Sequence, residues 1–366
     1  MITLQPTVSI IGAGPAGFAL AADIQEHGRS VLVYAHPDHL RHASLVMDKG
    51  CLSATGALKG FSHLPITSDM SEAVEFSRYI ILTVPSTGQE TVLQELKRFD
   101  LKRHMIIAIP GNLFSLIADA ELNAKCILET NFSPYSCRMD EKGLVVMGKK
   151  NRVFIAALQQ NLCPESRAEI QSILPVELKW CSSVIEVSLS NLNGVFHPLM
   201  MLLNVGRIEN TDGDFYIYRD GLTQSVANAM TAVDAVRVQV GRAFGLRLKS
   251  AVETSNESYG SRFTDLVDLA RNSGPHNKLK APADIKNRNI SEDVPDLLVC
   301  WLGLAERLGI DASPIKAVIT LAGLVAGVDY MKSGRNLKRL NLAQVRRNDL
   351  VRRFGVFLPV PRESRL

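Results

Sequence analysis

Three glycines near the start of the chain have the spacing of a phosphate-binding turn. Gly12, Gly14 and Gly17 form a G-x-G-x-x-G pattern between a β-branched apolar run at 8–11 and a helical pattern at 18–25. In such a turn the first glycine allows the tight bend, the second admits a pyrophosphate, and the third lets the helix pack on the strand. The helix N-terminus adds free N–H groups and partial positive charge. A purely structural turn is the alternative. The residues expected to contact a dinucleotide are Gly12, Ala13, Gly14, Pro15, Ala16 and Gly17.

The end of the next predicted strand, at 30–34, bears on which dinucleotide binds. An Asp or Glu commonly binds the ribose 2′-hydroxyl of NAD at this point. Here Asp38 comes late, beyond a proline, and the nearer polar residues are His36 and Arg41. These two side chains are expected to face a 2′-phosphate, so NADP(H) is favoured and NAD(H) stays open. The alternative is a solvated loop that is basic by chance.

Further candidates follow three apolar runs at 79–85, 105–110 and 126–129, each read as a strand buried on both faces. Ligands of open α/β sheets bind beyond the carboxyl ends of the strands. We therefore expect Val84 and Pro85 to contact the cofactor. Taken singly, polar residues after strands are more often turn or cap residues, but three remain candidates for the substrate or nicotinamide side: Gln89, Asn112 and Arg138.

The pattern of strands and helices that must position these residues indicates two domains. Strands alternating with helices indicate an α/β Rossmann domain over 1–184, with a doubly wound, mostly parallel sheet. Runs at 143–147 and 152–156 are expected to complete this sheet as antiparallel strands, whereas 44–60 shows little periodicity. From 185 to 366, Leu, Ala and Met recur at helical spacing, which predicts an all-α domain.

Composition excludes several function classes. The chain has 366 residues, a net charge of +4 and six scattered cysteines without metal-ligand spacing, so we expect no metal and no nucleic-acid partner. No apolar run reaches membrane-spanning length and no leader is evident, which predicts a cytoplasmic protein without a membrane partner. The Leu-rich helices could form a homodimer. Basic residues from Lys332 through Arg335 to Arg353 are read as a solvated helix face.

The combined motifs resemble the opine dehydrogenase family (octopine and nopaline dehydrogenases), and within it the octopine and lysopine synthases of crown-gall plasmids. The similarity runs from about residue 8 to 342, with a departure around 215–219 that leaves the amino-acid partner open. The motifs are the glycine turn, Thr83-Val-Pro-x-x-Gly-Gln89, Ser133-Pro-Tyr-x-Cys-Arg138, Asn193-x-x-x-His197-Pro198, Arg288-x-x-x-Glu-Asp293-Val, Gly334-Arg335 and Leu340-Asn-Leu.

The resemblance implies an NAD(P)H-dependent reductive condensation of small-molecule substrates. An L-amino acid joins a 2-oxo acid, pyruvate or 2-oxoglutarate, and the imine is reduced reversibly to an N-(carboxyalkyl)amino acid. It also implies that His197 and Asp293 form the acid/base pair and that Arg288 binds the carboxylate of the oxo acid.

The chemistry accounts for these residue types independently. An imidazole that titrates near neutrality suits both proton transfers of the condensation, a carboxylate fixes its tautomer, and a guanidinium fork matches a carboxylate. Read alone, His197 could be a core histidine, Asp293 a helix cap and Arg288 a surface charge. Tyr259, His276 and Asn204 are less favoured candidates.

Two rival functions remain at this stage. The first is a ketopantoate-reductase-like or 2-hydroxy-acid dehydrogenase that acts on an oxo acid alone. The second is a dinucleotide sensor without catalysis.

Overall fold

The computed structural model describes residues 6–159 and 162–356. Its N-terminal part is built on an eight-stranded sheet of order β12-β11-β8-β7-β6-β1-β2-β5. The pairs from β5 to β8 are parallel, β11 pairs antiparallel with β8, and β12 runs parallel to β11. This confirms the predicted mostly parallel Rossmann sheet. The strands are β1 (Val8–Ile11), β2 (Val31–Tyr34), β5 (Ile66–Thr67), β6 (Tyr79–Leu82), β7 (Met105–Ala108), β8 (Cys126–Thr130), β11 (Arg152–Ala157) and β12 (Glu177–Trp180).

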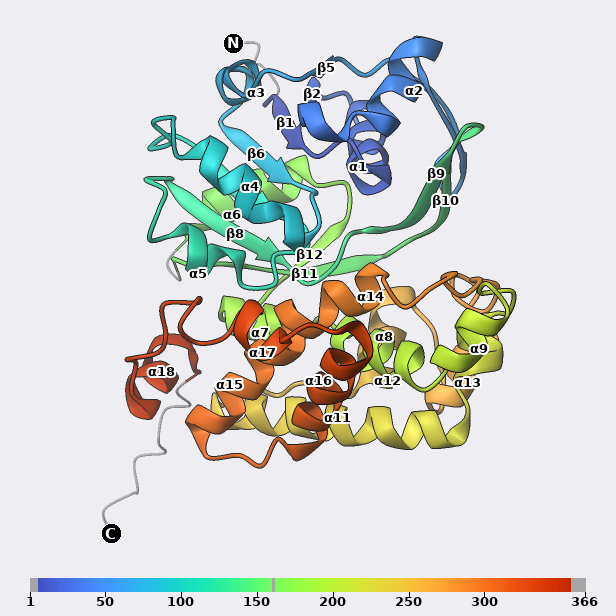
Figure 1. The fold of residues 1–366 in the computed structure, drawn as a ribbon. Coiled ribbons are helices and arrows are strands. Elements are labelled where there is room, and N and C mark those ends of the chain that lie inside the picture. Colours follow the sequence, from blue (N-terminus) through green and yellow to red (C-terminus); the bar gives the residue numbers. More distant parts are fainter. Residues whose placement is uncertain (1–5, 160–161, 357–366) are drawn as a thin grey trace.

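Helices cover both faces of this sheet, because the central strands are fully apolar and must be buried on both sides. One face packs against α3 (Met70–Phe76), α4 (Ser86–Leu96) and α5 (Phe114–Ala118). The opposite face packs against α1 (Pro15–Glu26) and α6 (Pro164–Ile173). The sheet and these helices form the upper half of the molecule in Figure 1.

A second, four-stranded sheet of order β4-β3-β10-β9 corrects one expectation. Residues 143–147 do not complete the main sheet, because they belong to β10, which pairs antiparallel with β9 and parallel with β3. Leu144 and Val146 are buried while Val145 is 41% exposed, so β10 has only one covered face. The strands are β3 (Leu52–Gly56), β4 (Gly60–Ser62), β9 (Tyr135–Asp140) and β10 (Gly143–Lys149).

Residues 44–60 have more structure than their weak periodicity indicates. They contain most of α2 (Arg41–Lys49) and all of β3. The β9–β10 hairpin runs past α1 toward the helices below (Figure 1). This hairpin therefore contributes to the boundary between the two halves.

All elements after β12 in the described residues are helical, as predicted. They are α7 (Val184–Leu189), α8 (Asn193–Leu202), α9 (Val205–Asn210), α10 (Ile217–Gly221), α11 (Gln224–Ala243), α12 (Ala251–Tyr259), α13 (Leu266–Asn272), α14 (Arg288–Ser291), a π-helical turn (Val294–Leu298), α15 (Val299–Leu308), α16 (Ser313–Ala326), α17 (Tyr330–Ser333) and α18 (Arg347–Phe354). No helix of the described chain is long and apolar enough to cross a membrane.

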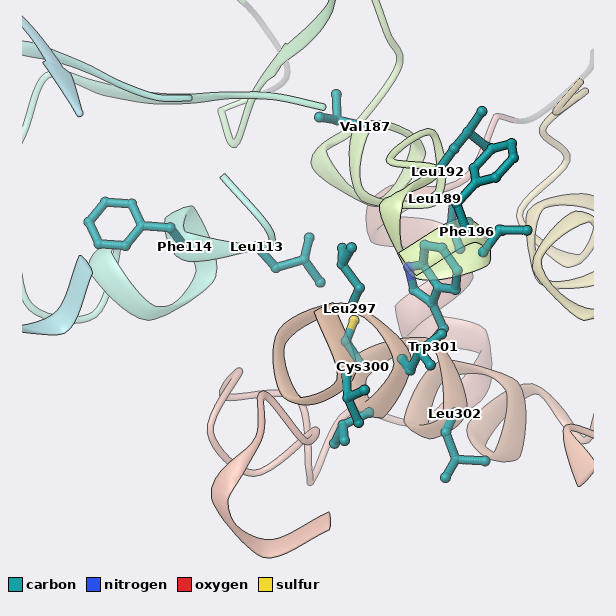
Figure 2. Packing of buried hydrophobic residues seen from close by; sticks show 14 of the residues in the cluster. Leu113, Phe114, Val187, Leu189, Leu192, Phe196, Leu297, Cys300, Trp301 and Leu302 are labelled. Carbon is teal, nitrogen blue, oxygen red and sulfur yellow. The ribbon is translucent and has the colours of Figure 1, made fainter. Parts of the chain in front are cut away.

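The two halves share one hydrophobic core. Leu113 and Phe114 of the Rossmann part belong to the same buried cluster as Leu297 and Trp301, and Figure 2 shows Leu113 directed toward Leu297. The Trp301 ring lies against α8, where a Cβ on Gly194 would come within 2.9 Å of it. The helix that carries His197 is therefore fixed against the helix that follows Asp293.

Candidate active site

The glycine turn has the geometry of a phosphate cradle. Gly12 has φ +126, and a Cβ there would lie 2.7 Å from Thr83 Oγ1. A Cβ on Gly17 would lie 1.9 Å from the Gly12 carbonyl oxygen, so α1 packs directly on the turn. A Cβ on Gly14 would meet nothing within 4 Å. The side of the turn at Gly14 is therefore open to a ligand.

The N-terminus of α1 completes this cradle. Gly14 is the N-cap residue, no side chain caps the helix, and Pro15 occupies the first turn. The first-turn N–H groups and the helix dipole are thus available to a pyrophosphate. Together with the open side of Gly14, this fits a dinucleotide cofactor.

The loop after β2 is more complex than the sequence indicates. His36 Nδ1 accepts a hydrogen bond from the Asp38 N–H at 3.1 Å, and its Nε2 lies 3.4 Å from a carboxylate oxygen of Glu95 on α4. Arg41, by contrast, is exposed at the first residue of α2. The Glu95 carboxylate beside His36 repels a phosphate, so Arg41 is the better placed of the two for a 2′-phosphate.

His197 and Asp293 meet although they lie on different helices. His197 Nδ1 is 2.7 Å from Asp293 Oδ2, and the two side chains are 18% and 6% exposed. A carboxylate only accepts hydrogen bonds, so Nδ1 carries the proton and Nε2 is the nitrogen that remains for a substrate. The Asp293 side chain caps no helix, and it precedes the π-helical turn, a geometry often found at functional sites.

One cavity of about 670 Å³ joins the glycine turn to His197. It is open enough to hold a nicotinamide ring beside two small substrates. Among its lining residues are Gly14, Pro15, Thr83, Pro85, His197 and Arg288. The structure therefore places His197, which is hydrogen-bonded to Asp293, on the same cavity as the open side of Gly14.

The predicted carboxylate-binding residue also lines this cavity. Arg288 is the first residue of α14, exposed, and without an ion-pair partner among residues 6–159 and 162–356. Arg138 on β9 lines the cavity from the opposite half of the molecule and is also exposed. Both guanidinium groups are available to an anionic ligand.

Two other predicted substrate residues do not line the cavity. Gln89 donates to the Pro110 carbonyl at 2.9 Å and accepts from Arg335 at 2.7 Å. Asn112 accepts a hydrogen bond from Asn191 at 2.8 Å. Both side chains thus bind protein groups in the folded chain, and neither lines the cavity. Asn204 likewise donates to the Met200 and Gly221 carbonyls rather than lining the cavity.

Arg335, which the sequence places in a solvated basic tail, is 1% exposed. Its guanidinium donates to the Gly111 carbonyl at 2.9 Å and lies 3.5 Å from Asp296. Burial raises the pKa of Asp296, while Arg335 opposes that rise. A solvated face is the wrong interpretation for this residue, because strand-end carbonyls and a buried carboxylate surround it.

Carboxylates on either side of Asp293 tie it to the Rossmann part. Glu292 accepts hydrogen bonds from the backbone N–H of Ser86 at 2.9 Å and from its hydroxyl at 3.1 Å. Asp296 accepts from the same hydroxyl at 2.5 Å. Ser86 follows Pro85, which lines the cavity, and a Cβ on Gly12 would lie 3.1 Å from Val84. The position of Asp293 is thus linked to the strand end beside the cradle.

Aromatic groups form the far wall of the cavity. His276 shares a hydrogen bond with Ser273 at 2.6 Å, and its ring centroid lies 4.9 Å from that of Tyr218 and 5.3 Å from that of Tyr259. Burial lowers the pKa of His276 to about 3, with Lys150 and His197 adding to the effect. His276 is therefore neutral at physiological pH. Within the described residues no cluster of three or more His, Cys, Asp or Glu could bind a metal ion.

Comparison with known proteins identifies both halves. Residues 180–326 match the family model of the NAD/NADP octopine/nopaline dehydrogenase alpha-helical domain. Residues 7–110 match the model of NADP oxidoreductase, coenzyme F420-dependent.

Full-length relatives and solved structures agree with these matches. The chain is 28% identical to Protein ocs of Agrobacterium tumefaciens (strain Ach5), covering 94% of this chain and 98% of that protein. It is 28% identical to opine dehydrogenase of Arthrobacter sp. (strain 1C), and the match covers 92% of this chain and 95% of that protein. An octopine dehydrogenase structure with NADH and L-arginine superposes with a TM-score of 0.75 at 17% identity. The superposition covers 94% of this chain and 98% of that one. A PanE/ApbA family ketopantoate reductase from Ralstonia eutropha gives a TM-score of 0.62 at 15% identity, covering 88% and 98%.

Proposed function

We propose that the chain is an opine dehydrogenase, an NAD(P)-dependent oxidoreductase acting on CH–NH donors, and that its own residues carry out the reaction as follows. The reaction joins the amino group of an L-amino acid to the carbonyl of a 2-oxo acid and reduces the resulting imine to a secondary amine. The observation that carries the assignment of roles is the hydrogen bond between His197 and Asp293 at the cavity that reaches the glycine turn.

In this proposal His197 handles the protons of the condensation. Its Nε2 takes a proton from the substrate ammonium, which frees the nitrogen lone pair to attack the carbonyl carbon. After the attacking nitrogen has passed a proton to the carbonyl oxygen, the imidazolium returns its proton to the hydroxyl of the carbinolamine, which leaves as water and gives the protonated imine. Asp293 stabilises the imidazolium through Nδ1 and fixes the orientation of the ring.

Arg288 orients the oxo acid. Its planar fork pairs with a carboxylate through two parallel hydrogen bonds, and it makes no ion pair among the described residues. An oxo acid bound by Arg288 would place its carbonyl carbon between His197 and the glycine turn at residues 12–17. The oxo acid is pyruvate or 2-oxoglutarate.

The glycine turn, residues 12–17, would hold the pyrophosphate of a dinucleotide, and Pro85 in the cavity lining, with its neighbour Val84, would contact the nicotinamide side. When bound, the reduced nicotinamide supplies the hydride that reduces the imine carbon. We propose a preference for NADP(H), with Arg41 as the contact to the 2′-phosphate. Affinities of wild type and Arg41→Ala for NADPH and NADH test this, because only NADPH affinity is expected to fall.

A substrate-dependence assay separates this function from its rivals. We expect NAD(P)H oxidation to require both an oxo acid and an amino acid. Equal rates without any amine would instead indicate a 2-hydroxy-acid or ketopantoate-type dehydrogenase. Cofactor binding without turnover on any pair of substrates would indicate a sensor. A cytoplasmic location and a homodimer remain predictions.

A further inference from the structure

The charged residues that line the cavity around His197 are all basic. Among residues 6–159 and 162–356, no Asp or Glu lines it, and the carboxylate of Asp293 is already engaged by His197. A cationic substrate side chain would therefore meet like charges and no counter-charge. Apart from the neutral His276, the basic lining residues are Arg138, Lys150, His197, Lys280 and Arg288.

Lys150 stands out among these because it is half-buried without an acidic partner. It lies between β10 and β11, and its ammonium donates to the Ser133 carbonyl at 2.9 Å. The ammonium also lies 5.1 Å from the Phe132 ring centroid and 5.6 Å from that of Tyr259. Within the described chain no carboxylate is at ion-pair distance from it. An ammonium has three donors, so two remain for a ligand.

Lys150 and Arg288 act on the same part of the cavity. Burial raises the pKa of the Cys137 thiol on β9 to about 11, and Arg288 and Lys150 both oppose this rise. The product of the proposed reaction carries two carboxylates, one from each substrate. Arg288 is assigned to the carboxylate of the oxo acid. Lys150, whose half-buried ammonium has no carboxylate at ion-pair distance in the described chain, suits the carboxylate of the amino acid.

The lining between these cations and the helical core is apolar. The neutral ring of His276 lies among aromatic rings there, 4.9 Å from Tyr218. Burial of an apolar substrate group against such a surface contributes about 25 cal/mol per Å². The apolar and aromatic lining residues on this side are Phe196, Met200, Ile217, Tyr218, Phe263 and Leu269.

We propose that the amino substrate is an L-amino acid with an uncharged, largely apolar side chain, and that Lys150 binds its α-carboxylate. This inference rests on the proposed function, because it divides the same cavity between the two substrates. The side chain lies against the aromatic wall, and arginine and lysine are disfavoured because they find no carboxylate.

A substrate panel tests the specificity. NADPH oxidation is measured with pyruvate and with 2-oxoglutarate, each against L-leucine, L-methionine, L-phenylalanine, L-arginine, L-lysine and L-glutamate. We expect kcat/KM for the apolar amino acids to exceed that for the cationic ones by about tenfold or more, which corresponds to about 1.4 kcal/mol. A preference for arginine, lysine or glutamate overturns this inference and leaves the proposed function intact. Oxidation with no amino acid at all overturns both.

A matched pair of lysine variants tests the role of Lys150. Lys150→Met is expected to raise the KM for the amino acid about 10- to 100-fold, the range for losing a charge-assisted hydrogen bond. Lys150→Arg should restore part of this loss, and the KM for the oxo acid should stay unchanged. Lys142→Met, at the exposed turn of the β9–β10 hairpin outside the cavity, is the control for a lost positive charge.

The readouts are chosen to separate binding from folding. Retained NADPH affinity and unchanged thermal stability show that a variant is folded. An unchanged KM for the amino acid in Lys150→Met, or a raised KM for the oxo acid only, contradicts the assignment.

Discussion

The two ends of the active site are built in different ways. The cofactor end is made by consecutive residues, 12–17, and works through backbone atoms and the start of one helix. The substrate end is made by side chains such as His197 and Asp293, which are 96 residues apart. The first end depends on the absence of side-chain atoms, and the second depends on their protonation and placement. Substitutions at the cofactor end should therefore impair packing or cofactor binding, whereas substitutions at the substrate end should impair catalysis.

The largest effect is expected at the substrate end. His197→Ala removes the proton-transfer group, so kcat should fall about 10²- to 10⁴-fold. NADPH affinity should not change, since the cradle is intact. Steady-state kinetics and nicotinamide fluorescence measure the two quantities, and His63→Ala at an exposed position is the control. Wild-type turnover in His197→Ala would remove this residue from the mechanism.

The next effect concerns the polar cluster that joins the two ends. Arg335→Met leaves Asp296 buried without its cationic neighbour, which should lower the free energy of unfolding by about 3–5 kcal/mol. Urea denaturation measures this loss, with the exposed Arg346→Met as the control. If the two variants were equally stable, the cluster would contribute nothing to holding the halves together.

A third pair of variants separates folding from binding at the cofactor end. Gly17→Ala forces a Cβ against the Gly12 carbonyl oxygen, so it should lower the free energy of unfolding by about 1–3 kcal/mol even without cofactor. Gly14→Ala places its Cβ in open space, so stability should hold while NADPH affinity falls. Calorimetry with and without NADPH distinguishes the two. Equal destabilisation of both variants would contradict the division of roles.

The last effect is a pH dependence at the aromatic wall. In the unfolded chain His276 has the ordinary imidazole pKa of 6.5, whereas burial in the folded chain lowers this pKa to about 3. The unfolded state thus binds more protons in this window, so stability present above pH 6.5 is lost progressively as pH falls toward 3. His276→Asn should lose less stability than wild type between about pH 7 and pH 4. Parallel loss of stability in the two proteins over this range, measured by urea denaturation, would show that the ring is not buried in its neutral form.

Strands buried on both faces could be predicted because their sequences are uninterrupted apolar runs. β1, β6 and β7 are of this kind. The sequence pattern places β10 in the wrong sheet because its alternation, with Leu144 buried and Val145 exposed, fits any one-sided sheet. Its parallel partner β3 lies far back in the chain, and no local pattern specifies that pairing.

The site shows the same contrast. The glycine turn could be predicted locally, whereas His197, Asp293 and Arg288 required a resemblance spanning nearly the whole chain. A polar side chain after a strand can face a ligand or, as Gln89 does, bind a neighbouring protein group. That neighbour is Arg335, which lies 246 residues further along. Only the folded arrangement reveals that this arginine is buried.

Identification of the reaction product decides between reductive condensation and reduction of the oxo acid alone. The enzyme is incubated with NADPH, a 2-oxo acid and a ¹⁵N-labelled amino acid, and the products are analysed by mass spectrometry for wild type and His197→Ala. The account predicts one labelled secondary amine for each NADPH consumed by the wild type, and a loss of this product in the variant. Formation of a 2-hydroxy acid, with the amino acid recovered unchanged, would contradict it.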